Sequence, residues 1–369
     1  MREFFGDFVI YRNLVPADRR LAAGNELSLE LGLTGGPPPR KAENEYGLIV
    51  AEMLRQARKL DFPKTMVKRL VYIGDTHMND GTAFRNICLA GSWPGWAFIG
   101  QEDMSMPRHV VYDEPFVLAN RWSALSEFLS FLDEKGFVRD EETVVVIDVD
   151  KTAIGAKGRN DGVIDDVRVE SAKRTVADVL GTGFNEEIFR AAYSELKQAP
   201  YHLFTADNQD YLAYICLILG AGIFTLDQLI REIRSNRITG FVPFITLVQN
   251  RREELGASGL TTVHDDVWSR VQRGDPTPFK LFRYIEYQAT ISRFGDMPGE
   301  TVEEILRQRI VITQEVRDIA MEMRRRGALI FGVSDKPDEA AFPLDANTGL
   351  KPLHRAESLA VGEFCGNMS

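Results

Sequence analysis

The sequence has little cysteine, no excess of positive charge and no apolar run long enough to cross a membrane. Its three cysteines, Cys88, Cys216 and Cys365, lie far apart without C-x-x-C spacing, so neither a disulfide framework nor a zinc site is indicated. We therefore expect a reducing, cytoplasmic environment. The longest apolar stretch, 211–226, is shorter than the roughly 20 residues of a spanning helix and predicts a buried helix.

Negative charge dominates, because 54 Asp and Glu oppose 44 Lys and Arg and give a formal net charge of -10. Binding to nucleic acid or to an anionic membrane depends on clustered Lys and Arg, so we expect neither partner. The N-terminal segment has no apolar run or small-residue cleavage site of the kind that directs secretion. The length of 369 residues predicts two domains, each large enough to bury its own core.

Strands and helices alternate in two separate parts of the chain. Upstream, helical spacing over 42–60 leads into an apolar strand, KRLVYIGD, and the β-branched run TVVVIDVD at 143–150 is typical of a strand buried on both faces. Downstream, a helix or helix pair over 302–327 leads into a strand at 328–333. This alternation predicts an α/β fold with a doubly wound parallel, Rossmann-like sheet. The segments DFVIYR and LSLELGL, within residues 1–34, are weaker strand candidates.

Long helical patterns with few strand signals fill the middle of the chain, from about Gly155 onward. We therefore expect a core formed by residues 1–154 and 312–369, interrupted by a helical domain at 155–311. The patch GGPPPRK, which starts at Gly35, is expected to be a loop.

Polar residues follow three of the expected strands, and in parallel α/β sheets ligands bind at the carboxyl ends of strands. Asp148 and Asp150 follow the clearest strand, and in an extended segment their side chains would share a face. Asp75 and Asp80 follow a second strand. Carboxylate oxygens suit a hard cation such as Mg²⁺, and a metal would also relieve the repulsion between neighbouring carboxylates. For a solitary Gly-Asp turn, an ordinary strand-ending turn is the alternative.

Two further positions could bind an anion. The Ser334 hydroxyl follows the strand at 328–333 and could hold phosphate oxygens, although a Ser-Asp pair can also be a simple cap. Lys41 precedes the helix that leads into the Gly74-Asp75 strand, so it would reach the same edge of the sheet. Lys336 and Lys351 are alternatives for this cationic role.

Together these segments resemble the haloacid dehalogenase superfamily. DVDKT resembles its D-x-D-x-T motif, and LIFGVSDKPDEA is similar to its apolar strand ending in Ser or Thr. IGDTHMND is similar to its Gly-Asp motif with a second Asp, and KAENEYGLIVAEMLRQA to its lysine-then-helix motif. In the usual family order the lysine and Gly-Asp motifs follow the serine motif, whereas here both precede D-x-D. The resemblance therefore implies a circularly permuted chain, with the helical insert as a cap domain.

The resemblance implies a Mg²⁺-dependent phosphatase that acts on a small phosphorylated metabolite. Asp148 would be the nucleophile and Asp150 the general acid and base, with Mg²⁺ held by Asp148, Asp150, Asp75 and Asp80. Ser334 and Lys41 would bind the phosphate, and Thr152 would support the loop after the first motif.

Other functions remain open from the sequence. A phosphomutase or another phosphotransferase would use the same site with a different acceptor. A nucleotide-sugar glycosyltransferase also uses a D-x-D pair after a strand, and a non-catalytic binding protein could share the fold. The sequence leaves the substrate and the oligomeric state undetermined.

Overall fold

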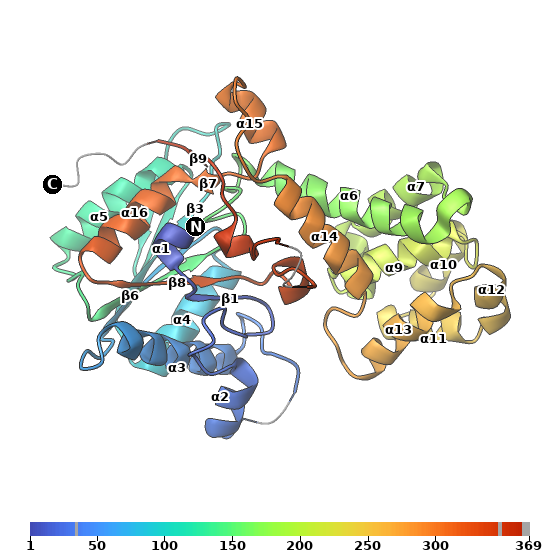
Figure 1. Ribbon diagram of the computed structural model, residues 1–369, viewed down its shortest axis with the longest axis horizontal. Coiled ribbons are helices and arrows are strands. Elements are labelled where there is room, and N and C mark those ends of the chain that lie inside the picture. Colours follow the sequence, from blue (N-terminus) through green and yellow to red (C-terminus); the bar gives the residue numbers. More distant parts are fainter. Residues whose placement is uncertain (34–35, 346–348, 364–369) are drawn as a thin grey trace. The chain divides into compact units, whose positions relative to one another are not determined.

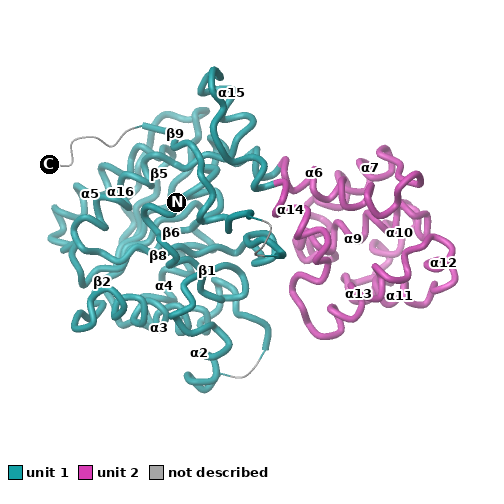
Figure 2. The backbone as a smooth tube through the Cα atoms, in the orientation of Figure 1, with its two compact units in different colours: residues 1–165, 290–369 teal, residues 166–289 magenta. Residues whose placement is uncertain are grey.

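The computed structural model describes residues 1–33, 36–345 and 349–363, which form two compact units (Figures 1 and 2). Unit 1 comprises residues 1–165 and 290–369, and unit 2 comprises residues 166–289. Unit 1 thus includes segments 155–165 and 290–311, which the sequence had placed in the insert. Gly35, the first residue of the expected glycine- and proline-rich loop, and Cys365 lie outside the described residues.

A mostly parallel seven-stranded sheet forms the centre of unit 1, which confirms the α/β prediction. The strands lie in the order β1 (Val9–Ile10), β8 (Leu329–Val333), β6 (Thr143–Asp148), β2 (Arg69–Gly74), β3 (Gly95–Gly100), β5 (Phe116–Ala119) and β4 (Val110–Asp113). Within this sheet, β4 pairs with β5 antiparallel, and the other described neighbours pair in parallel. A separate pair joins β7 (Ile312–Thr313) to β9 (Ala360–Val361).

Helices cover both faces of the sheet (Figure 1). On one face α3 (Asn44–Asp61) packs against α4 (Asn79–Gly91), and on the other α5 (Leu125–Glu134) packs against α16 (Gln314–Arg325). Unit 1 also contains α1 (Arg2–Phe5), α2 (Gly24–Glu30) and α15 (Val302–Gln308).

The central strands are apolar because both of their faces are buried. Val144 and Val146 of β6 pack with the core that includes α3, while Val145 and Ile147 are equally buried on the alternate side. On α3, apolar residues recur at helical spacing and face the sheet. At Gly47, an added Cβ would lie 2.5 Å from the backbone oxygen of Asn86, so glycine permits the close packing of α3 on α4.

Several sequence-based boundaries were wrong. The segment LSLELGL was expected to be a strand, but its first half belongs to α2, where the Glu26 carboxylate accepts a hydrogen bond from the Ala23 N–H and caps the helix. The extended segment at 143–150 ends at Asp148, because the chain turns at Val149. The hairpin of β4 and β5 was not anticipated.

Unit 2 is entirely helical in its described residues. It contains α7 (Glu186–Leu196), α8 (His202–Thr205), α9 (Gln209–Gly220), α10 (Leu226–Arg234), α11 (Phe241–Gln249), α12 (Arg252–Ala257) and α13 (Thr261–Gln272). Helices α6 (Asp161–Leu180) and α14 (Lys280–Ser292) run across its two boundaries with unit 1.

The core of unit 2 includes α9, which is the buried helix expected from the apolar stretch. Inside it, His264 lies 2.5 Å by Nδ1 from the Tyr214 hydroxyl and 2.6 Å by Nε2 from Oε1 of Gln249. A neutral imidazole satisfies both partners by accepting from Tyr214 and donating to Gln249. No helix in the described part of the chain is long and apolar enough to cross a membrane.

Candidate functional site

The three strands with polar residues at their carboxyl ends are neighbours in the sheet. Strand β6 pairs with β8 on one side, where Asp148 lies opposite Val333, and with β2 on the other, where Ile147 lies opposite Ile73. Parallel pairing brings the carboxyl ends of all three strands to one edge. This edge therefore brings together polar side chains from parts of the chain that lie far apart in the sequence.

Lys41 forms the centre of the site. Its Nζ lies 2.5 Å from Oδ1 of Asp148 and 2.9 Å from Oδ1 of Asp80. All three side chains are at most 6% exposed. Burial lowers the pKa of Lys41, but the two carboxylates outweigh this effect and raise it well above its usual value. The ammonium group therefore stays charged and bridges the two strand ends.

Asp80, in the first turn of α4, is held by donors on both carboxylate oxygens. Oδ1 accepts a hydrogen bond from the Tyr72 hydroxyl at 3.0 Å as well as from Lys41. Oδ2 accepts from the N–H groups of Asp75 and Thr76, at 3.1 and 3.0 Å, and from the Thr76 hydroxyl at 3.0 Å. With both oxygens occupied, Asp80 is suited to orient Lys41 and the loop after β2.

Gly74 makes this arrangement possible. A Cβ at this position would lie 2.6 Å from Cγ of Asp80, closer than non-bonded carbon atoms approach. Any side chain here would push the Asp80 carboxylate away from the loop. The Gly-Asp sequence at the end of β2 is thus explained by a close approach to Asp80.

Asp75, Asp80 and Asp148 form a cluster that could hold a metal ion, since one carboxylate oxygen from each lies within 4.8 Å of the others. Burial, followed by the charge of Asp80, raises the pKa of Asp75 to about 7. Burial raises the pKa of Asp148 as well, because Lys41 does not fully offset burial and the charges of Asp80 and Asp75. The cluster brings three carboxyl groups together, and oxygen atoms of this kind suit a hard divalent cation.

Asp148 and Asp75 can offer oxygen atoms to such an ion. Oδ2 of Asp148 has no hydrogen-bond partner within the described ranges, and Oδ2 of Asp75 lies 3.4 Å from Lys157 Nζ. Asp80 contributes its charge nearby while its oxygens stay bonded to protein groups.

Lys157 approaches the cluster from the loop that follows β6, and its Nζ donates to the Asp75 backbone oxygen at 2.9 Å. Its own backbone oxygen accepts from the Glu102 N–H at 2.8 Å and from the Trp122 indole at 3.2 Å. At Gly158, where φ is +78°, a Cβ would lie 1.9 Å from the Glu102 oxygen, so glycine is needed for the loop to pack here.

The position of Asp150 differs from the one that the sequence predicted. Because β6 ends at Asp148, Asp150 lies beyond the strand, in a turn where it bridges to Ile154. Its carboxylate is not part of the described three-aspartate cluster, and the expectation that one extended segment places Asp148 and Asp150 on a shared face was wrong. Asp150 remains two residues from Asp148 and is half-buried.

Ser334 directly follows β8 and is 5% exposed. Its N–H donates to the Ile10 oxygen, and its hydroxyl accepts the Lys336 N–H at 3.0 Å. Among the alternative lysines, Lys336 is buried beside Ser334, while Lys351 pairs with Glu357 at 2.5 Å and is 58% exposed. Lys41, in contrast to Lys351, contacts Asp148 directly.

Sequence reasoning missed Tyr72, Thr76 and Lys157. Tyr72 looked like one more apolar residue of β2, and nothing in its pattern indicated a hydrogen bond to Asp80. Thr76 could have been found, because it follows the Gly-Asp pair. Lys157 had a weak signal, its position between Gly155 and Gly158 in a tight loop.

Comparisons with protein-family models, with curated proteins and with solved structures found no match to this chain.

Proposed function

We propose that the chain is a Mg²⁺-dependent phosphatase of the haloacid dehalogenase type, with Asp148 as its nucleophile. The observation that carries this proposal is the Lys41 ammonium group, which bridges Asp148 and Asp80 in a buried site beside Asp75. An anionic nucleophile, a fixed cation and a cluster of metal-type oxygens are what attack on an anionic phosphate requires.

The order of the strands is compatible with a circular permutation. The proposed motifs occur along the chain as Lys41, Gly-Asp, D-x-D and serine, yet β2, β6 and β8 lie side by side with β6 in the middle. A permutation changes where the chain begins and leaves the packed sheet intact. In this proposal the helical insert after D-x-D is the cap.

In the first step, an Asp148 carboxylate oxygen forms a bond to phosphorus as the bond from phosphorus to the ester oxygen breaks. Asp150 serves as the general acid and gives a proton to the leaving oxygen. In the second step the Asp150 carboxylate takes a proton from water, whose oxygen bonds to phosphorus and releases Asp148. The products are an alcohol and inorganic phosphate.

Lys41 holds Asp148 in place and favours its ionised form against burial, and together with Ser334 it can bind phosphate oxygens. Asp148 and Asp75 would hold Mg²⁺, with Asp80 orienting Lys41 beside them. The bound ion would supply positive charge that reduces the repulsion between nucleophile and phosphate.

The position of Lys41 favours this reading over a D-x-D glycosyltransferase, in which both aspartates would serve a metal-bound diphosphate. Here Asp148 pairs with a lysine and Asp150 lies outside the carboxylate cluster. A phosphotransferase would use the same first step and differ only in the acceptor.

The test is phosphate release from a panel of phosphate esters, with Mg²⁺ or with EDTA, using wild type, Asp148→Asn and the exposed control Asp113→Asn. We expect metal-dependent release that falls roughly 10³-fold or more in Asp148→Asn, because the nucleophile is lost at nearly constant volume. Asp113→Asn should retain full activity. Retention of activity in Asp148→Asn would contradict the proposal, as would failure to find the phosphorylated aspartate in a rapidly quenched wild-type reaction.

A further inference from the structure

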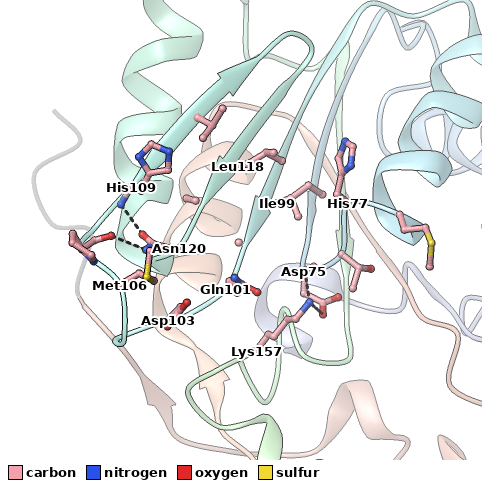
Figure 3. Close-up of a pocket in the computed structure, with 16 residues that line it drawn as sticks. Asp75, His77, Ile99, Gln101, Asp103, Met106, His109, Leu118, Asn120 and Lys157 are labelled. Atoms are coloured by element: carbon pink, nitrogen blue, oxygen red, sulfur yellow. Dashed lines mark hydrogen bonds and ion pairs between the residues drawn. The ribbon is translucent and has the colours of Figure 1, made fainter. Parts of the chain in front are cut away.

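A pocket of about 580 Å³ lies beside Asp75, entirely within unit 1 (Figure 3). Its walls come from the ends of β2, β3, β4 and β5, from the connection between β3 and β4, and from the loop that carries Lys157. Asp75 is a wall of the pocket and a member of the carboxylate cluster. The pocket therefore begins where the proposed reaction takes place.

Strand register explains the apolar floor of the pocket. Gly74 lies opposite Ile99, Ile99 opposite Leu118, and Leu118 opposite Val111. Paired residues on neighbouring strands point to the same face, so Ile99, Leu118 and Val111 form a row across three strands. The row ends at Gly74, where Asp80 fills the space of the missing side chain, and Asp75 lines the pocket beside it.

Methionines extend this apolar surface at the rim. Met78 is 78% exposed and Met106 is 59% exposed, and both line the pocket. Such flexible, polarisable side chains can adapt to the outline of a bound molecule. The pocket thus offers an apolar floor and an adaptable apolar edge.

Three side chains around the floor can form directional hydrogen bonds. His77 and His109 lie on opposite sides of Ile99 and Leu118, with Gln101 below them (Figure 3). Within the described ranges, none of these three side chains has a hydrogen-bond partner, whereas the Asn120 amide is engaged by the backbone of His109 and Pro107.

The charge of the lining excludes a second strongly anionic group. Its charged side chains are Asp75, Asp103 and Lys157, and Lys157 is paired with Asp75. The second phosphate of a bisphosphate would lie close to Asp75 and Asp103, and the lining lysine, Lys157, is already paired with Asp75. A sugar or polyol would bury hydroxyl groups against the row of Ile99, Leu118 and Val111, which is unfavourable without partners.

We propose that this pocket binds the alcohol half of the substrate and that this alcohol is an uncharged nucleoside whose heteroaromatic base lies on the apolar row, so that the substrate is a nucleoside monophosphate. A heteroaromatic ring presents apolar faces to the floor and polar edge atoms to His77, Gln101 and His109. The volume suits a ligand of this size. The inference rests on the proposed phosphatase function for the position of the phosphate.

The first test compares kcat/KM for adenosine monophosphate with kcat/KM for glycerol 3-phosphate, in the presence of Mg²⁺. Val111→Trp should fill the pocket from the edge strand, and Val110→Trp is the matched control because Val110 does not line it. We expect wild type to prefer adenosine monophosphate by about 100-fold and Val111→Trp to reduce the preference at least tenfold. Equal use of the two esters by wild type, or an unchanged preference in Val111→Trp, would overturn the inference and leave the phosphatase proposal standing.

A second measurement separates the two proposals if no ester is hydrolysed. Calorimetric titration with adenosine, which has no phosphate, tests the pocket without any reaction. Saturable binding that weakens at least tenfold in Val111→Trp, and not in Val110→Trp, would support the pocket assignment even though the phosphatase proposal had failed. Absence of adenosine binding to the inactive wild type would overturn the pocket assignment as well.

Discussion

Removal of the Lys41 charge tests the electrostatic design of the site directly. In Lys41→Met the side-chain stem is nearly preserved, while Asp80 and Asp148 lose the ammonium group that lies 2.9 and 2.5 Å from them. Because both carboxylates are at most 6% exposed, water cannot replace the lysine. Breaking a buried ion pair by removing one partner costs about 3–5 kcal/mol, so we expect the free energy of unfolding of unit 1 to fall by that amount without metal.

Amide hydrogen exchange in β6 and β2 measures this change separately from the helices of unit 2. Lys157→Met is the matched control, because Lys157 is 30% exposed and lies 3.4 Å from Asp75. Its ion pair should contribute only about 1 kcal/mol or less. Mg²⁺ should restore much of the stability of Lys41→Met, since an ion present at 100 times its dissociation constant stabilises by about 2.7 kcal/mol.

Two results would refute the reasoning. One is a loss below about 1 kcal/mol in Lys41→Met without metal, which would mean that the carboxylates do not need the lysine. The other is a Mg²⁺ effect absent from both Lys41→Met and wild type, which would mean that the cluster does not bind the ion.

Other perturbations test the loop after β2 and the core of unit 2. Gly74→Ala should displace the Asp80 carboxylate and destabilise unit 1 by roughly 1–3 kcal/mol. The control Gly162→Ala places its methyl group in open space on α6 and should be neutral or stabilising. Thermal unfolding measures both variants, and equal effects would mean that the close approach of Gly74 to Asp80 is unimportant. His264 has its pKa lowered to about 4 by burial, so unit 2 should keep its full stability above pH 6.5 and lose it as the pH falls toward 4, because the unfolded state binds the proton first. Hydrogen exchange in α13 as a function of pH checks this, and His264→Gln should flatten the dependence; an equally steep dependence in that variant would assign it to other groups.

The central strands and their polar ends could be predicted from the sequence because each carries a strong local pattern. A run of β-branched residues leads into Asp148, and an apolar strand leads into Gly74 and Asp75. Both patterns reflect burial on two faces followed by a loop. Placing Asp148 and Asp75 at one edge needed only the rule that parallel strands end at the same side, and Lys41 was placed there by the helix that leads into β2.

The remaining features depend on tertiary contacts that the local pattern does not encode. The hairpin of β4 and β5 is short, and Val111 and Tyr112 on β4 are exposed, so its apolar signal is weak. The segment that forms α2 alternates like a strand, but the Glu26 cap favours a helix. The bridge from Lys157 to Asp75 depends on the anchoring of its loop by Glu102, just beyond the end of β3, and by Trp122, which no spacing rule predicts.

The late position of β8 in the sequence also affects how the protein folds during its synthesis. The last strand beside β6 is made only after the roughly 180 residues that separate them, which at 5–20 residues per second takes on the order of 10–40 s. During this interval, while the chain is still on the ribosome, the edge of the apolar strand β6 that later pairs with β8 has no strand beside it. Unit 2 has its own core and can fold during this interval. In a nascent chain arrested before Leu329, we therefore expect chaperones to bind the exposed edge of β6 and not the helices of unit 2.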